Sequence, residues 1–191
     1  MRTYLSRTWI SPKLACRKSA IHGDGIFASA PIAAGEKVME FGGSTISRAE
    51  VLSDNYRYRS MWMVDRDIFL ALPNCDTEAS LDENLNHSCE ANIWLEDVVN
   101  LTARVDIPAG AELTLDQGTW NCGTWDFDED DYAEGRGCSC GAPQCRGSLT
   151  EQDCHLAEVR ERYAGHFHPL VQAMIDRADA APQTVRRRAK G

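Results

Sequence analysis

The chain has no long apolar run and no excess of positive charge. No stretch of its 191 residues approaches the ~20 uninterrupted apolar residues that would span a bilayer, and Met1-Arg2-Thr3-Tyr4 opens no apolar signal core. We therefore expect a soluble intracellular protein without a membrane partner, in the cytoplasm, the nucleus or chromatin. Because 29 acidic residues against 20 Lys and Arg give a net charge of −9, the composition argues against direct nucleic-acid binding. It favours basic, lysine-containing partners.

The charge is unevenly distributed along the chain. A dense acidic run covers residues 126–131, and a basic tail covers residues 186–190. The acidic run could attract a basic partner, but a solvated loop explains it equally well. From about Ala180 onward the sequence is small, polar and basic, so we expect a frayed tail.

Half of the eight cysteines have the spacing of metal ligands. Cys89 closes the run Asn86-His87-Ser88-Cys89, and a C-x-C-x4-C cluster follows much later at Cys138, Cys140 and Cys145. Four thiolates hold zinc tetrahedrally and leave no position for water, so we predict a structural metal site. Such a site folds the tail segment back as a lid over residues 86–89.

Two alternatives to this metal site stay open. The cysteines could be buried free thiols, or the trio could take another fourth ligand such as Cys122 or His155. The glycines and proline around the trio make that segment unlike a packed core. The cysteines outside the cluster match no ligand motif and are expected as core or surface thiols in a reducing compartment: Cys16, Cys75, Cys122 and Cys154.

Short strands dominate the chain before residue 150. Residues 60–64 and 68–72 flank a charged turn and predict a hairpin. Four further short apolar runs are bounded by Gly, Pro, Asn or Asp and predict strands: 37–41, 93–95, 101–105 and 112–115. After Leu149 the pattern changes, because Thr150 and Asp153 are typical of a helix N-cap and the apolar residues that follow have helical spacing. We expect two short helices there.

Four motifs occur in one order along the chain: residues 18–28 with Gly23-Asp24-Gly25, residues 86–92, residues 111–116, and the Cys138–Gly147 segment. In this order the sequence resembles SET-domain protein-lysine methyltransferases with a post-SET zinc segment. The resemblance covers residues 18–149 and is weaker over 44–80.

This resemblance implies a mainly β fold of several small twisted sheets with a pseudoknot, a zinc-bound post-SET lid and a C-terminal helical extension. The implied segments are an N-terminal segment (1–17), the SET domain (18–134), the post-SET segment (135–149), the helical extension (150–179) and a flexible basic tail (180–191).

The resemblance also implies a cofactor, S-adenosylmethionine, bound by Gly23, Asp24, Gly25, Asn86 and His87. Two glycines permit close backbone approach to such a ligand. On spacing alone, the glycines more often belong to a turn between strands, and an Asn-His pair is more often a turn with a hydrogen-bonded histidine.

The catalytic position departs from the family pattern. Relatives carry a tyrosine where this chain has Gln117, and a second channel tyrosine where it has Phe41. Gln117 offers a carbonyl acceptor but cannot titrate as a phenol does. Tyr58 or Tyr132 could reach in instead, and Trp120 is a candidate channel wall.

Two functions of different class follow. The first is methyl transfer to a lysine of a basic, histone-like protein, which alignment and desolvation can support without one hydroxyl. The second is a catalytically impaired module that binds the cofactor, a lysine-containing peptide or both. A purely structural zinc protein, a third possibility, would bind no cofactor.

Overall fold

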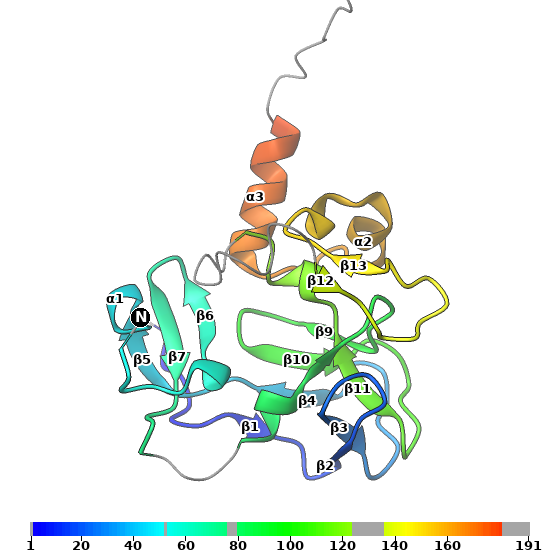
Figure 1. Ribbon diagram of the computed structural model, residues 1–191, viewed down its shortest axis with the longest axis horizontal. Helices are drawn as coiled ribbons and strands as arrows, with labels where there is room; N and C mark the ends of the chain where they lie inside the picture. Colours follow the sequence, from blue (N-terminus) through cyan, green and yellow to red (C-terminus); the bar gives the residue numbers. More distant parts are fainter. Residues whose placement is uncertain (1, 52, 76–79, 124–135, 181–191) are drawn as a thin grey trace, which may run out of the picture.

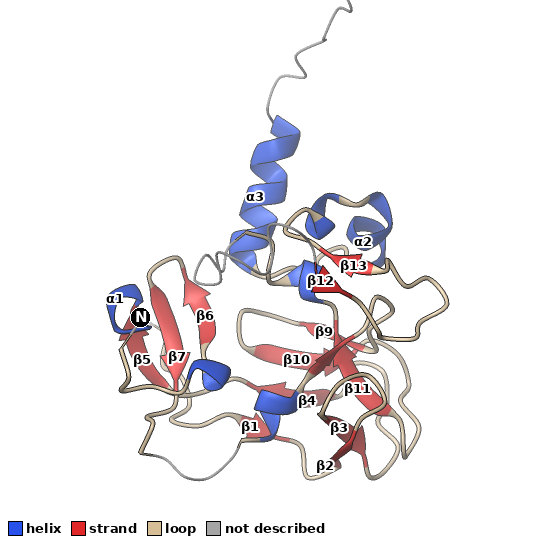
Figure 2. Cartoon of the chain, viewed as in Figure 1, coloured by secondary structure: helices blue, strands red, loops and turns tan. Residues whose placement is uncertain are grey.

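Short strands build the protein, as Figures 1 and 2 show. The computed structural model describes residues 2–51, 53–75, 80–123 and 136–180. The acidic run, Tyr132 and the basic tail lie outside these residues. Two four-stranded sheets form the centre, with strand orders β1-β4-β10-β9 and β2-β3-β11-β8.

The strands of the first sheet are all antiparallel: β1 (Trp9–Ile10), β4 (Lys37–Glu40), β10 (Asn100–Ala103) and β9 (Ile93–Leu95). The second sheet contains β2 (Leu14–Lys18), β3 (Asp24–Ala28), β11 (Glu112–Leu115) and β8 (Asn86–His87). In it β8 pairs with β11 in parallel, which brings Asn86 and His87 beside Thr114 and Leu115.

A third sheet, in the order β5-β7-β6, stands beside the first (Figure 1). Its strands are β5 (Ser44–Ser47), β7 (Ile68–Ala71) and β6 (Trp62–Asp65), with α1 (Arg48–Val51) at its end. The predicted hairpin therefore exists as β6 and β7, and the other predicted strands correspond to β4, β9, β10 and β11. The predictions missed β1, β2, β3, β5 and β8, and the short strand pair at residues 136–137 and 148–149.

The C-terminal part of the described chain lies over one end of the molecule (Figure 2). It contains the pair β12 (Arg136–Gly137) and β13 (Ser148–Leu149), then α2 (Ala157–Arg162) and α3 (Pro169–Ala180). Single 3-10 turns are η1 (Tyr58–Ser60), η2 (Leu81–Asn84), η3 (Gln117–Thr119) and η4 (Asp153–His155). Among the described residues, no helix is both long and apolar enough to span a bilayer.

Two sequence predictions in this region need correction. Thr150 does donate from its backbone N and its Oγ1 to Asp153 Oδ1, but this pair closes a turn before η4. The helix α2 starts only at Ala157 because the chain is extended at Leu156 (φ −67°, ψ 133°). Cys122 and Cys154 are not free thiols, since a disulfide joins them across a Cα–Cα distance of 6.1 Å.

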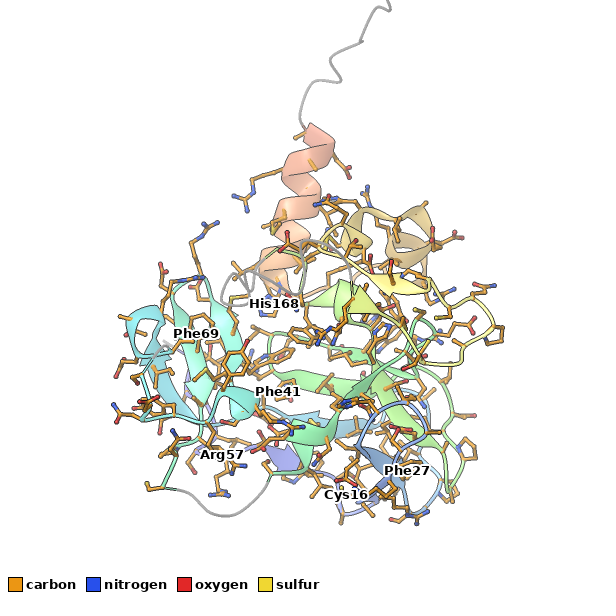
Figure 3. All side chains as sticks on the ribbon, viewed as in Figure 1. Cys16, Phe27, Phe41, Arg57, Phe69 and His168 are labelled. Carbon is orange, nitrogen blue, oxygen red and sulfur yellow. A yellow bond between two sulfur atoms is a disulfide. The ribbon has the colours of Figure 1, made fainter. Side chains whose placement is uncertain are left out.

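Apolar side chains fill three connected regions of the interior. The largest lies between the two central sheets and includes Ile26, Met39 and Leu113, all fully buried. A second packs α2 and α3 against the disulfide. A third belongs to the β5-β7-β6 sheet and includes Phe69. Phe41 lies where this last sheet faces β4 (Figure 3), beside the clefts described next.

Candidate functional site

The turn between β2 and β3 has a backbone that a bound molecule can approach closely. Gly23 has a left-handed backbone (φ +51°), which glycine adopts without strain. A Cβ on Gly25 would lie 2.2 Å from Glu112 Oε1, so only glycine fits there without displacing that carboxylate. The Asn86 amide Nδ2 donates to Glu112 Oε1 (2.8 Å) and to the carbonyls of His22 (3.1 Å) and Asp24 (3.0 Å). Asn86, a residue of β8, therefore holds the turn in place through these hydrogen bonds.

Two adjoining cavities open beside this turn. One of about 250 Å³ is lined by Ile21, Asn86, His87 and Leu149, together with the backbone of residues 136–140. The other, of about 290 Å³, is lined by Gly23, Asp24, Glu83 and Asn86, among others. Both include His22, Leu85 and Asn86 in their walls, so we treat them as one cleft, the turn-side cleft.

A third cavity, of about 310 Å³, lies on the other side of Gln117 and is here called the aromatic cleft. Phe41 and Trp62 stack in its wall with ring centroids 3.9 Å apart, and Trp120 lies 5.3 Å from Trp62. Both predicted channel residues, Phe41 and Trp120, thus line one cavity. Tyr58 lies at its rim and is 45% exposed.

The two clefts share part of their walls. Leu85, His87 and Gln117 line both the aromatic cleft and the 250 Å³ part of the turn-side cleft. The backbone N–H of Gln117 donates to His87 Nδ1 (3.1 Å). Burial lowers the pKa of His87 to about 4, so the imidazole is neutral at pH 7. Because Nδ1 accepts, the proton of this neutral ring is on Nε2.

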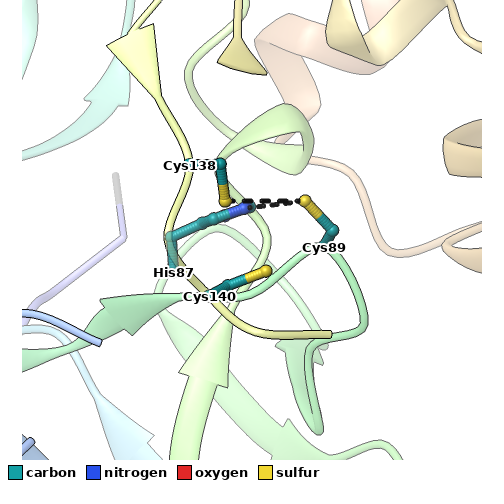
Figure 4. A group of neighbouring side chains, drawn as sticks. All are labelled: His87, Cys89, Cys138 and Cys140. Atoms are coloured by element: carbon teal, nitrogen blue, oxygen red, sulfur yellow. Dashed lines mark hydrogen bonds between the residues drawn. The ribbon is translucent and has the colours of Figure 1, made fainter. Parts of the chain in front are cut away.

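At His87, one of the shared wall residues, a cluster of sulfur and nitrogen atoms begins (Figure 4). The ligand atoms of His87, Cys89, Cys138 and Cys140 all lie within 4.8 Å of one another. Cys145 borders the group, with its thiol interacting with those of Cys138 and Cys140. Three of the four predicted ligands therefore share the cluster, and His87 joins it unpredicted.

The hydrogen bonds favour Cys145 over His87 as the fourth ligand. The Nε2 proton of His87 points to Cys89 Sγ at 3.3 Å, so the ring donates to that sulfur and has no lone pair there for a metal. Cys145, in contrast, is half-buried beside Cys138 and Cys140, with whose thiols its own thiol interacts. The alternative ligand Cys122 is excluded by its disulfide.

Without a metal, the thiols of this cluster differ in how readily they ionise. Burial raises the pKa of Cys138 to about 11 and that of Cys89 further. Burial also acts to raise the pKa of Cys140, but hydrogen bonds from the backbone and from neighbouring thiols outweigh it and lower the pKa to about 7. Such buried thiols need a cation to ionise together, and a soft thiolate set of this kind fits Zn²⁺ in a closed, structural site.

The sequence analysis missed a buried charged cluster beside the metal site. Arg146 directly follows Cys145 and pairs with Asp116 and Asp153, all three side chains being 7% exposed or less. Its position in the Cys-Arg-Gly run was visible, but Asp116 lies 30 residues away in sequence and no spacing pattern connects Arg146 to Asp153, seven residues further on. Leu149 is buried and lines the turn-side cleft.

Comparison with known proteins identifies the family to which this chain is similar. The family model for the SET domain matches residues 23–118. The Arabidopsis thaliana histone-lysine N-methyltransferase ATX2 is 30% identical over 170 residues, which are 85% of this chain and 15% of that protein. Human histone-lysine N-methyltransferase SETD1B is 29% identical over 151 residues, 72% of this chain and 7% of the relative. The chain therefore spans only a small part of the relatives' length.

A solved structure shares the fold. The crystal structure of KRYPTONITE in complex with mCHG DNA and SAH superposes with a TM-score of 0.53 at 25% identity, over 73% of this chain and 29% of that one. It agrees with the overall arrangement of small sheets described above. Because the SET-domain match covers half of the chain, the protein belongs to the SET-domain family.

Proposed function

We propose that the protein transfers a methyl group from S-adenosylmethionine to the side-chain amine of a lysine in a basic protein. The observation that carries this proposal is the junction of the two clefts at His87 and Gln117. Transfer between two bound molecules needs two sites that meet at one point, with the reacting atoms in line. Curated relatives with the same domain are histone-lysine methyltransferases.

The turn-side cleft suits the cofactor. Its walls combine Gly23 and Asp24 of the turn, the Asn86 and His87 pair and the apolar residue Leu149. Polar backbone for an amino-acid portion and a partly apolar wall for a base are both present. When bound, the cofactor supplies an electrophilic methyl group on a positively charged sulfur.

The aromatic cleft suits a lysine chain. Its stacked rings cover the aliphatic stem and exclude water from the amine. At pH 7 a lysine of pKa ~10.4 is neutral only about once in 2,500, which corresponds to about 4.6 kcal/mol. Burial among Phe41, Trp62 and Trp120 lowers that pKa, because an apolar wall disfavours the ammonium form.

Gln117 takes the position of the family's tyrosine at the junction. Its side-chain carbonyl can accept a hydrogen bond from the amine and so orient its lone pair, but it cannot accept the proton. The proton therefore leaves to solvent from the exposed side of the cleft before transfer. In this proposal alignment and desolvation supply the rate.

A second candidate function is a SET module that binds cofactor and peptide but transfers slowly or not at all. It is favoured by the two missing hydroxyls, at Phe41 and Gln117. Among the described residues, Tyr58 is the tyrosine that lines the aromatic cleft, and it lies at the exposed rim. The substitution Gln117→Tyr separates the two candidates.

The test is methyl transfer from labelled S-adenosylmethionine to a mixture of basic proteins, with cofactor binding measured by calorimetry. The proposal expects transfer by the native protein. Cofactor binding without transfer, and transfer by Gln117→Tyr alone, would replace the proposal by the second candidate. Absence of cofactor binding in the zinc-loaded protein would remove both.

A further inference from the structure

Arg146 makes more charged hydrogen bonds than any other side chain of the site described above. Its Nη1 and Nη2 donate to Asp116 Oδ2 (2.8 Å) and Oδ1 (2.7 Å), a bidentate pair. Its Nε donates to Asp153 Oδ2 (2.9 Å). The three residues come from the post-SET lid, from the end of β11 and from η4. One guanidinium thus joins three segments, of which that of Asp116 lies 30 residues away in sequence.

The Asp116 carboxylate caps the turn that contains Gln117. Its Oδ1 accepts from the backbone N–H of Gly118 (2.9 Å), and its carbonyl accepts from Thr119. A side-chain cap of this kind fixes the start of a helical turn. Gln117 is the first residue of that turn, η3, and its own N–H is bonded to His87 Nδ1.

The turn η3 also packs directly on the second carboxylate. A Cβ on Gly118 would lie 3.1 Å from Asp153 Cβ and 3.3 Å from Asp116 Oδ1, tighter than ordinary contact. The turn is therefore enclosed between the two aspartates that Arg146 binds. Any movement of the guanidinium changes the space available to Gly118 and, one residue away, to Gln117.

We propose that Arg146 is a positioning residue: by clamping Asp116 and Asp153 it holds η3 so that Gln117 stands at the junction of the two clefts. This role rests on the proposed methyl transfer. Arg146 touches neither cleft, because it is absent from the walls of both. It acts through Gln117, and its effect is on the alignment of the two substrates.

Arginine is required here for a geometric reason. Its planar fork meets both oxygens of Asp116 while Nε reaches Asp153, whereas a lysine ammonium cannot make all three bonds from one point. Burial alone would lower the pKa of Arg146, but its bonds to Asp116 raise it above the usual range, so the charge is retained. A lysine at this position would keep the positive charge but could not form all three hydrogen bonds.

The clamp also connects the metal site to the junction. The backbone N–H of Arg146 donates to Cys89 Sγ (3.4 Å), and the residue before it is the metal-ligand candidate Cys145. Closing the lid around the metal therefore places the guanidinium against Asp116. In this arrangement the metal has a function beyond holding the lid, since it sets the position of Gln117.

The decisive variant is Arg146→Lys in the zinc-loaded protein. The matched control is Arg160→Lys, because Arg160 also forms a two-bond pair with a carboxylate, that of Asp179, but at the surface and away from the clefts. Two readouts are needed: hydrogen exchange of the Gln117 and Gly118 amides by NMR, and kcat and KM of methyl transfer to a lysine-containing basic protein.

For Arg146→Lys we expect exchange at Gln117 and Gly118 to rise about tenfold while amides of β2 and β3 keep their protection. We also expect kcat to fall about tenfold or more with KM for the basic protein changed less than about twofold, because the wall of the aromatic cleft is unchanged. Arg160→Lys should change none of these. Unchanged exchange at both amides, or equal loss of protection throughout the chain, would overturn the proposal.

A second variant keeps the test decisive if Arg146→Lys does not fold. Asp153→Asn leaves the bidentate pair with Asp116 but removes one acceptor oxygen, so it weakens the third bond of Arg146 or the bonds from Thr150 to Asp153. It should raise exchange at the same two amides by a few-fold, and an unchanged rate would count against the clamp. If the native protein transfers no methyl group, the proposed function fails, whereas the exchange measurements still decide whether Arg146 positions η3.

Discussion

Replacing Gly25 by alanine tests whether the cofactor-side turn is set by its contact with Glu112. The added Cβ would lie 2.2 Å from Glu112 Oε1 and 3.0 Å from Ser19 Cβ. The backbone of Gly25 is not in the left-handed region, so alanine adds no backbone strain. The carboxylate must move, and it then loses its bonds from Asn86 Nδ2 (2.8 Å) and Ser19 Oγ (2.9 Å).

The expected loss of stability follows from those two bonds. A hydrogen bond to a charged group contributes about 1.5–3 kcal/mol. Since Glu112 is only half-buried and water replaces part of this, we expect unfolding free energy to fall by about 2 kcal/mol in total. Asn86 keeps its bonds to the carbonyls of His22 and Asp24 and moves together with them. Because Asn86 lines the turn-side cleft, the affinity for the cofactor should fall about tenfold.

Urea denaturation and cofactor calorimetry measure the two effects, and a double-mutant cycle identifies their cause. In a Glu112→Ala background the clash with the carboxylate is absent, and only the tight 3.0 Å approach to Ser19 Cβ remains. There Gly25→Ala should be neutral, or stabilising by up to about 1 kcal/mol, because alanine restricts the unfolded chain. A loss of about 2 kcal/mol in both backgrounds would refute the reasoning, since Glu112 would then not be the obstacle.

Three further predictions concern the metal, pH and the disulfide. Cys140→Ser should release zinc and weaken cofactor binding while far-UV circular dichroism stays unchanged; cofactor affinity that survives chelation would show that the lid is not coupled to the cleft. Burial lowers the pKa of His168 to about 4, so its neutral form contributes roughly 3 kcal/mol above pH 6.5 that is lost as pH falls toward 4. His168→Gln should therefore show a flatter stability profile between those pH values in urea titrations, and equal profiles would contradict this. Cys122→Ser with Cys154→Ser should lower unfolding free energy by about 2–4 kcal/mol, and an equal midpoint with and without reductant in the native protein would argue against the bond.

Local sequence signals predicted those parts of the fold that local chemistry determines. The strands β4, β9, β10 and β11 are short apolar runs closed by Gly, Pro, Asn or Asp, and each lies where the pattern indicated. The strand β3 was missed because Gly25 lies within it, and glycine is normally a turn signal. Its presence there has a tertiary cause, the carboxylate of Glu112.

The candidate site was predictable only where a motif carried it. Three of the four expected metal ligands do lie together, and the signal that predicted them was a cysteine spacing typical of zinc sites. The donor role of His87 depends on Gln117 approaching its other ring nitrogen, which no spacing reveals. The clamp of Arg146 and the Cys122–Cys154 bond join residues about thirty positions apart without any motif. Such pairings follow from the packed fold.

The most direct test of the whole account is a single turnover with labelled S-adenosylmethionine bound to the zinc-loaded native protein, chased with a lysine-containing basic protein and analysed by mass spectrometry. The account predicts one added methyl group on a lysine residue, formed by the native protein with Gln117 in place. A complex that binds both molecules, yet adds no methyl group until Gln117 is replaced by tyrosine, would contradict it.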